Sequence, residues 1–243
     1  AIISRGRATN YGTLRDQVAA LRGAFIGMGL QPGDRLAIIA GNNRYFVVSY
    51  LAALGAGLVA VPLNPTNPPV AMAHELRESG AVAIVASPTA RKALGAIDWD
   101  KVPGVAHFVG AGFEPGPLGV QFDDLLSHDP APVVDRDPDD VAVLIFTSGT
   151  AGAPRPAMLT HGNLYTNIRQ VLAAEEQVQL PSDVVFGLLP MFHIFGLNVV
   201  LGVSLTAGAS VLLVERFDPV SAIESIVKHG VTNIAGPPTM WAA

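Results

Sequence analysis

Residues 146–163 contain the densest group of residues in the chain that could carry out chemistry. Positions 147–155 hold two threonines, a serine, two glycines and one arginine, between two apolar runs. Glycines let backbone N–H groups turn toward a ligand, while hydroxyls and a cation add donors and charge. A loop of this kind between two strands is suited to bind an anion, and we expect a polyphosphate. The candidate contacts are Thr147, Ser148, Gly149, Thr150, Gly152 and Arg155.

This segment resembles the phosphate-loop signature of the adenylate-forming superfamily, which includes acyl-CoA synthetases, beetle luciferases and the adenylation domains of peptide synthetases. The usual pattern is Thr-Ser-Gly-Thr-Thr-Gly-x-Pro-Lys-Gly, a short apolar strand and a Thr/Ser-His pair that opens a helix. The matching positions are Thr147, Ser148, Gly149, Thr150, Gly152, Pro154, Met158, Leu159, Thr160 and His161. Three positions depart, because Ala151 replaces the second Thr, Arg155 the Lys and Pro156 the Gly.

Other interpretations of the glycine-rich segments fit less well. The alternative for residues 146–163 is a plain turn between strands, since the same residue types form turns for many reasons. The chain has no Gly-x-x-x-x-Gly-Lys-Ser/Thr, which argues against a P-loop NTPase. Residues 55–60 match a dinucleotide fingerprint loosely but follow an expected helix. Ser148 lacks the Gly-x-Ser-x-Gly frame of a hydrolase nucleophile.

A second candidate site surrounds His193 in residues 189–197. A lone His among apolar residues is more often a structural residue, but this one fits the family's second motif, Pro-x-x-His-x-x-Gly. The resemblance implies that His193 is catalytic and positions the carboxylate or the α-phosphate. Amino-acid-activating relatives commonly carry an Asp here, since a buried ammonium needs an anionic partner. The apolar flanks of His193 therefore indicate a fatty or aromatic acid.

The resemblance also places the acyl group of the substrate. Residues 233–240 are similar to a loop that lines the acyl pocket in the family, although a proline turn ending a strand is an alternative. No metal-ligand cluster is predicted. The expected substrate contacts are Phe192, Phe195, Gly196 and Gly236.

Composition excludes several classes of function. Half of the 243 residues are hydrophobic and 14% are charged, so the chain can bury a large core. A net charge of −5 without a Lys/Arg cluster argues against nucleic-acid binding. Residues 184–214 lack charged side chains, but Pro190, Asn198 and glycines interrupt them, so a strand–loop–helix–strand succession explains them better than a membrane span. Without a signal peptide or any cysteine, we expect a cytoplasmic protein.

Alternating patterns predict an α/β fold with βαβ-type, largely parallel sheets and helices on both faces. The expected helices are 13–28, capped by Thr13, then 45–54, 70–79, 161–175, 196–205 and 219–229. The expected strands are 35–40, 58–62, 81–86, 141–146, 184–188, 210–214 and 231–235. His74, Glu75, Arg77 and Glu78 are expected on the wetter face of their helix. We predict a first subdomain over 1–180 and the truncated start of a second over 181–243, with the family's small C-terminal domain absent.

The resemblance implies a two-step ligase of fatty acid metabolism. A carboxylic acid is activated with ATP and Mg²⁺ as an acyl-adenylate, and coenzyme A then accepts the acyl group as a thioester. Because the first step joins two anions, catalysis must neutralise charge and align the attack. The chain would be an N-terminal fragment that is inactive alone. Two alternatives remain: an acyl-AMP ligase that loads a carrier protein, and a non-catalytic nucleotide- or acyl-binding relative suggested by Arg155 and Pro156.

Overall fold

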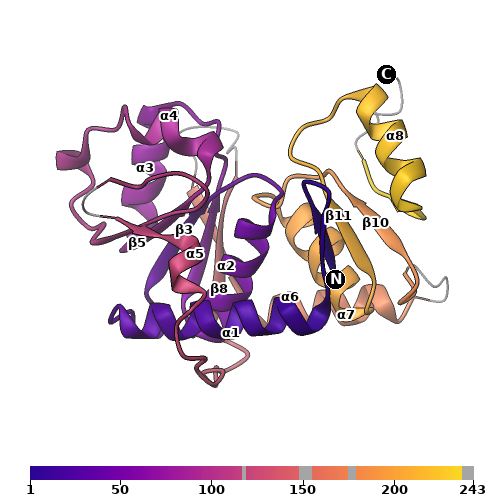
Figure 1. Cartoon of the computed structure of the whole chain (residues 1–243). Helices are drawn as coiled ribbons and strands as arrows, with labels where there is room; N and C mark the ends of the chain where they lie inside the picture. Colours follow the sequence, from indigo (N-terminus) through magenta and orange to yellow (C-terminus); the bar gives the residue numbers. More distant parts are fainter. Residues whose placement is uncertain (117–118, 148–154, 175–178, 237–243) are drawn as a thin grey trace. The chain divides into compact units, whose positions relative to one another are not determined.

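A computed structural model describes residues 1–116, 119–147, 155–174 and 179–236 (Figure 1). The strands form two sheets, and the chain divides into two units. The large-sheet unit comprises Arg15–Gly41 and Tyr45–Gly162, and the small-sheet unit comprises Ala1–Leu14, Asn42–Arg44 and Asn163–Ala243. Of the candidate site residues, Ser148, Gly149, Thr150 and Gly152 lie outside the described residues, as does Glu175 at the expected end of a helix.

The large-sheet unit is built on a seven-stranded sheet in the order β7-β6-β5-β3-β4-β8-β9. All neighbouring strands are parallel except β8 and β9, which pair antiparallel. The strands are β3 (Arg35–Ile39), β4 (Val59–Leu63), β5 (Ala83–Ala86), β6 (His107–Gly110), β7 (Val120–Gln121), β8 (Val141–Thr147) and β9 (Arg155–Thr160). The four strands predicted in this unit are thus confirmed as β3, β4, β5 and β8, and the sheet also contains β6, β7 and β9.

Helices cover both faces of this sheet. The helices are α1 (Tyr11–Gly27), α2 (Arg44–Gly55), α3 (Pro69–Ser79), η1 (Pro88–Ala90), α4 (Arg91–Leu94), η2 (Trp99–Lys101) and α5 (Phe122–Leu125). The chain passes from β3 to β4 in one direction and from β4 back across β3 to β5 in the other. Because such crossovers are right-handed, α2 and α3 lie on opposite faces. Residues of α3 and α4 pack with alternate residues of β3, β4 and β5 in one buried apolar cluster.

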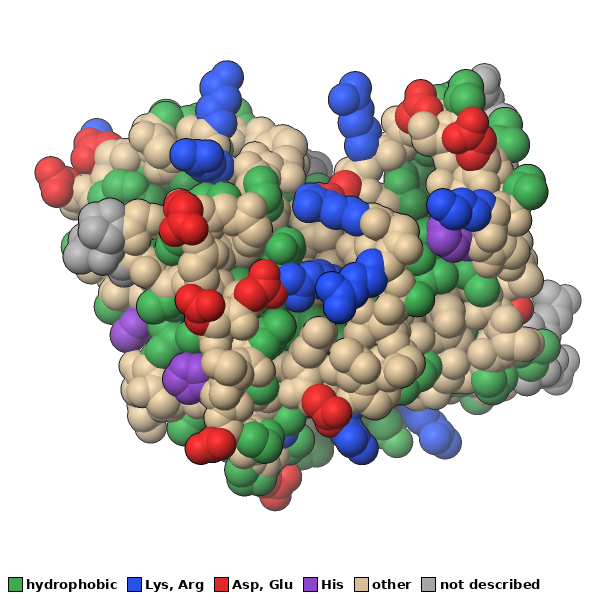
Figure 2. Space-filling model, in the orientation of Figure 1, with side chains coloured by type: hydrophobic (Ala, Val, Ile, Leu, Met, Phe, Trp, Pro, Cys, Tyr) green, Lys and Arg blue, Asp and Glu red, His purple; other side chains and the backbone are tan. Residues whose placement is uncertain are grey.

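The small-sheet unit has the strand order β12-β10-β11-β1-β2. Its elements are β1 (Ile2–Ser4), β2 (Arg7–Thr9), α6 (His161–Leu172), β10 (Val184–Gly187), the π-helix η3 (Phe195–Val203), α7 (Ser204–Thr206), β11 (Ser210–Leu213), α8 (Pro219–His229) and β12 (Asn233–Ile234). Strands β1, β10, β11 and β12 run parallel, so their carboxyl ends meet at one edge of the sheet. Helix α8 has an exposed apolar stripe, visible in Figure 2, formed by Val220, Ile223 and Val227.

The N-terminal strands account for the difference from the predicted division near residue 180. Strand β1 pairs with β11, with Ile2 opposite Val211, and not with any strand of the larger sheet. The first fourteen residues therefore group with residues beyond 162. A pairing between segments about two hundred positions apart leaves no local pattern in the sequence. Among the described helices, none is long and apolar enough to cross a bilayer.

Two local expectations were wrong. Helix α1 is capped by Asn10 instead of Thr13, because the Asn10 side-chain oxygen accepts a hydrogen bond from the Thr13 backbone N–H at 2.8 Å. Glu75 lies in the interior, not on the wet face of α3, and is only 6% exposed. The Asn67 amide donates to both Glu75 carboxylate oxygens at 2.9 Å. Burial raises the pKa of Glu75, an effect that this hydrogen bonding opposes.

Candidate active site

The anion-binding segment forms the connection of a β-hairpin. Thr147, the last residue of β8, is paired across the hairpin with Arg155, the first residue of β9. Both side chains are exposed, so a hydroxyl and a guanidinium flank the start and the end of residues 148–154. The described ends of the hairpin thus offer a hydrogen-bond donor and a positive charge, which suits an anionic ligand. Pro156 lies opposite Phe146 on β9, an edge strand where the missing N–H of proline is tolerated.

A polar cluster fixes the far end of this hairpin. The backbone N–H of His161 donates to the Asp140 carbonyl at 3.0 Å, and that of Gly162 donates to the Pro138 carbonyl at 2.7 Å. The Asp140 carboxylate forms an ion pair with Arg136, whose Nε lies 3.0 Å from Asp140 Oδ2. The pKa of His161 is lowered by burial first and by Arg136 second, against the opposing charge of Asp140. The neutral imidazole is therefore favoured for His161, which is the first residue of α6 directly after β9.

His193 lies in the loop that follows β10 at the carboxyl edge of the small sheet. This loop turns back on itself, since the His193 N–H donates to the Pro190 carbonyl at 3.0 Å. The His193 carbonyl then accepts from the Leu197 N–H at 2.9 Å, where η3 begins. The imidazole is exposed, and its ring centroid lies 4.8 Å from that of Phe192. His193 is thus presented at a strand-to-helix junction, as the motif predicted.

The predicted substrate residues share this edge of the sheet. Phe192, Phe195 and Gly196 belong to the His193 loop and the first turn of η3. Gly196 is buried, whereas Phe195 is 51% exposed. Gly236 follows β12, the neighbour of β10, two residues after the paired Ile234. The structure therefore brings His193 and the four predicted substrate residues to one edge, with apolar rings accessible beside the imidazole.

Sequence reasoning missed Asn42, which is bonded to the same loop. The Asn42 amide donates to the carbonyls of Gly187 and Leu189, both at 2.9 Å. Its side-chain oxygen accepts from the Met191 N–H at 3.0 Å. A short polar residue in a loop gives no signal of a partner 149 positions away.

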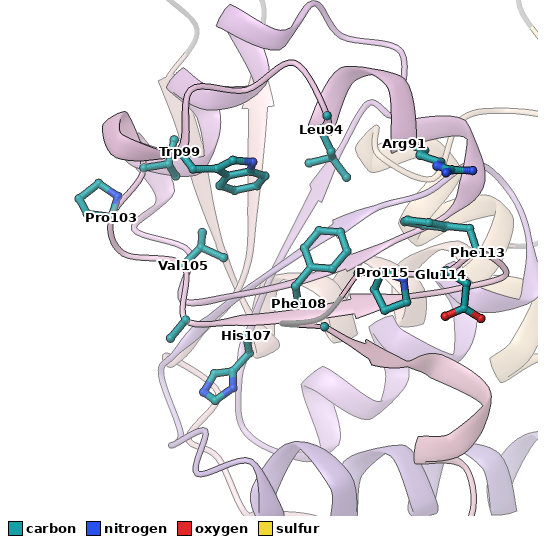
Figure 3. A pocket seen from close by; sticks show the side chains of 15 residues that line it. Arg91, Leu94, Trp99, Pro103, Val105, His107, Phe108, Phe113, Glu114 and Pro115 are labelled. Atoms are coloured by element: carbon teal, nitrogen blue, oxygen red, sulfur yellow. The ribbon is translucent and has the colours of Figure 1, made fainter.

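An apolar pocket of about 580 Å³ opens in the large-sheet unit (Figure 3). Its walls include the paired rings of Phe108 and Phe113, whose centroids lie 6.4 Å apart, together with Leu94 and Trp99. None of the predicted site residues lines this pocket. We therefore derive no step of the reaction from it. Within the described ranges, no group of three or more His, Cys, Asp or Glu side chains is arranged to hold a metal ion.

Comparisons with known proteins show the family and the fold of the chain. A sequence profile of the family described as AMP-binding enzyme matches residues 1–243. The chain belongs to this family. It is 32% identical over 246 residues to a feruloyl-CoA synthase of an Amycolatopsis species, covering 100% of the chain and 46% of that protein. It is 30% identical to a long-chain-fatty-acid–CoA ligase of Bacillus subtilis (strain 168), over 88% of the chain and 43% of the ligase.

Solved structures share the fold. ATP-bound MatB from Rhodopseudomonas palustris superposes on 100% of the chain and 47% of its own length, with a TM-score of 0.83 and 28% identity. The chain thus spans about half the length of the relatives that it matches. Family membership confirms the resemblance found in residues 146–163 and the predicted α/β fold. The roles of individual residues stay predictions.

Proposed function

We propose that the protein to which this chain belongs activates a carboxylic acid with ATP and transfers the acyl group to coenzyme A. In the first step a carboxylate oxygen attacks the α-phosphorus, pyrophosphate leaves, and an acyl-adenylate forms. In the second step the thiol sulfur attacks the acyl carbon, AMP leaves, and the thiol proton is released. The observation that carries the proposal is the hairpin, because Thr147 and Arg155 flank the signature loop of a family whose relatives include acid–CoA ligases.

The hairpin binds the polyphosphate in this proposal. Thr147 and the residues Ser148, Gly149, Thr150 and Gly152 donate hydrogen bonds to the β- and γ-phosphates, and Arg155 adds positive charge. Donors placed where negative charge develops are typically the largest contributors to catalysis of such a transfer. Arg155 is exposed, and its planar guanidinium suits bidentate contact with phosphate oxygens. Mg²⁺ would neutralise phosphate charge when bound, but the described residues provide no ligand cluster for it.

His193 orients the acid in this proposal. Its exposed imidazole can donate a hydrogen bond to the carboxylate or to the α-phosphate as the two anions approach. The neighbouring rings of Phe192 and Phe195 contact the apolar body of the acid, and Gly196 and Gly236 leave room for it. No carboxylate lies among these residues to pair with an ammonium, which favours a fatty or aromatic acid over an amino acid. The similarity to a feruloyl-CoA synthase and to a fatty-acid ligase supports the same substrate class.

Coenzyme A is the proposed acceptor because both of those relatives are named for CoA thioesters. A carrier-protein phosphopantetheine is the alternative acceptor. We also propose participation in fatty acid metabolism and a cytoplasmic location, which the absence of cysteine suits.

Acid-dependent exchange of labelled pyrophosphate into ATP tests the first step on the full-length protein. We expect exchange with a hydroxycinnamic or a long-chain fatty acid and only background exchange with amino acids. His193→Ala should lower the exchange rate by about 10²-fold, the low end of the range for a positioned proton-donating group. Exchange with amino acids alone, or none with any acid, would overturn the proposal. Acyl transfer to free coenzyme A, compared with a phosphopantetheine-loaded carrier protein, separates the two acceptors.

A further inference from the structure

We propose that Asn42 is a positioning residue for His193, holding the backbone of the loop that carries the imidazole. The proposal rests on the proposed role of His193 in acid activation. It concerns a residue of the segment Asn42–Arg44, which belongs to the small-sheet unit although its sequence neighbours belong to the other unit. Asn42 is 4% exposed and therefore acts within the protein and not on solvent.

The side-chain nitrogen of Asn42 donates both of its hydrogens to this loop. A primary amide has two N–H donors and one carbonyl oxygen. Both donors reach loop carbonyls at 2.9 Å, those of Gly187 and Leu189, and the oxygen accepts the Met191 N–H at 3.0 Å. The three bonded residues alternate along the chain, so one side chain ties three peptide groups between the end of β10 and His193. Because these groups are removed from water, leaving them unpaired would be costly.

The same loop is closed on its other side by Gly196. A Cβ at Gly196 would lie 2.6 Å from the Leu189 oxygen and closer still to the Pro190 oxygen, so there is no free space between η3 and the loop. Met191 adds an apolar anchor, since it is fully buried. The peptide groups of Leu189 and Pro190 are therefore held between Asn42 and the start of η3.

The backbone of the loop is held by hydrogen bonds to described residues, but the imidazole of His193 is not. Its side chain is exposed, and no hydrogen bond or ion pair joins it to another residue in the ranges that the structure describes. Its place is fixed through its backbone, by the bonds to Pro190 and Leu197 and by the contact with Phe192. A shift of the loop would therefore shift the imidazole. Displacements of about 1 Å at a reacting centre lower rates by about 10²-fold.

The test is a double-mutant cycle on the full-length protein. Asn42→Ala removes all three bonds, and Asn42→Asp keeps an acceptor for Met191 but loses both donors, so it serves as the second variant if the first fails to fold. We expect Asn42→Ala to lower kcat for pyrophosphate exchange by about 10- to 100-fold, with KM for ATP changed less than about 3-fold. If Asn42 acts through His193, Asn42→Ala should cause little further loss in a His193→Ala background.

Tyr11→Phe is the matched control. The Tyr11 hydroxyl donates to the Ala209 carbonyl at 2.7 Å, so this change removes a side-chain-to-backbone bond at the opposite, amino edge of the same sheet. We expect it to leave kcat within about 2-fold of the unchanged protein while lowering stability. Equal losses of kcat in Tyr11→Phe and Asn42→Ala, or independent effects of Asn42→Ala and His193→Ala, would overturn the proposal.

Amide hydrogen exchange of Met191 separates this proposal from the proposed function. Asn42→Ala should speed exchange at Met191 more than at residues of β11, whether or not the protein adenylates an acid. If the protein shows no pyrophosphate exchange, but the Met191 amide hydrogen exchanges fast in Asn42→Ala, the proposed function is overturned and the positioning role of Asn42 is still supported. Unchanged protection of the Met191 amide hydrogen in Asn42→Ala would overturn the positioning role of Asn42, whatever the activity of the protein.

Discussion

Substitution of Gly196 by alanine is the most direct test of how the His193 loop is closed. The constraint at Gly196 is space, not backbone conformation, because its φ is not positive. The added Cβ would meet backbone atoms, which cannot rotate aside as a side chain does. The Leu189 oxygen must retreat from 2.6 Å to at least 3.0 Å, a displacement of 0.4 Å or more, and the Pro190 oxygen must move further.

This displacement sets the size of the expected effects. Forced overpacking of a closed site costs about 1–3 kcal/mol, so Gly196→Ala should lower the free energy of urea unfolding by this amount. The pyrophosphate exchange rate of the full-length protein should fall by about 10- to 100-fold, since the imidazole moves with the loop. KM for ATP should change little.

Gly27→Ala provides the control, because a Cβ there meets no atom within 4 Å. Gly27 is the last residue of α1, where alanine is a better helix former than glycine. We expect Gly27→Ala to keep full activity and unchanged or higher stability. If Gly196→Ala behaves like Gly27→Ala in both assays, the loop is not packed against η3 as described, and the reasoning on His193 fails.

Three further changes probe other parts of the chain. Arg5 has a left-handed φ of 49° in the β1–β2 turn and an exposed salt bridge to Glu215. Because the conformational cost exceeds what such a pair contributes, Arg5→Asn should leave the thermal midpoint unchanged or higher, and a clear decrease would contradict this. Burial raises the pKa of Glu75 above 4.5, so the folded protein holds that proton more tightly. This contribution to the free energy of unfolding is greatest below pH 4.5 and is lost as pH rises through the raised pKa. Urea unfolding from pH 4 to 7 should show that Glu75→Gln lacks this part of the pH dependence, and an unchanged slope would refute it. Arg155→Lys combined with Pro156→Gly restores the family pattern and frees the backbone. Adenylation should then be faster or unchanged, whereas lost activity in a folded protein would show that this loop works in a different geometry.

The sequence predicted best those elements whose ends are marked by capping or helix-ending residues. Helix α8 begins at Pro219 and ends at His229 as expected. The Asp218 carboxylate caps its first turn by accepting from the Ser221 N–H at 2.9 Å, and Gly230 ends the helix in a left-handed conformation. Each of these residues acts within one turn of the helix end that it marks, so a few neighbouring residues in the sequence are enough to predict that end. Helix α1 was placed less well because Asn10 and Thr13 are both good capping residues.

The site was predictable where its residues are adjacent in sequence. The hairpin around residues 148–154 and the strand-to-helix loop of His193 follow directly from motifs. Asn42 and Glu75 were missed for a shared physical reason. Each is a buried polar side chain whose hydrogen-bond partner lies in another segment, the loop after β10 for Asn42 and Asn67 before α3 for Glu75. Helical periodicity and loop composition carry no information on such partners.

The pairing of β1 with β11 has a consequence for how the chain is made. The large-sheet unit comprises Arg15–Gly41 and Tyr45–Gly162. All of its strands have therefore been made once β9 emerges from the ribosome. Strand β1, which is made before the large-sheet unit, must wait for β11, which begins at Ser210. At ordinary rates of synthesis that interval is about 10–40 s. During it, the buried face of Ile2 and the open strand edge of the N-terminal hairpin remain available to other chains. The β1–β2 hairpin is therefore a segment that a nascent-chain chaperone would protect during this interval.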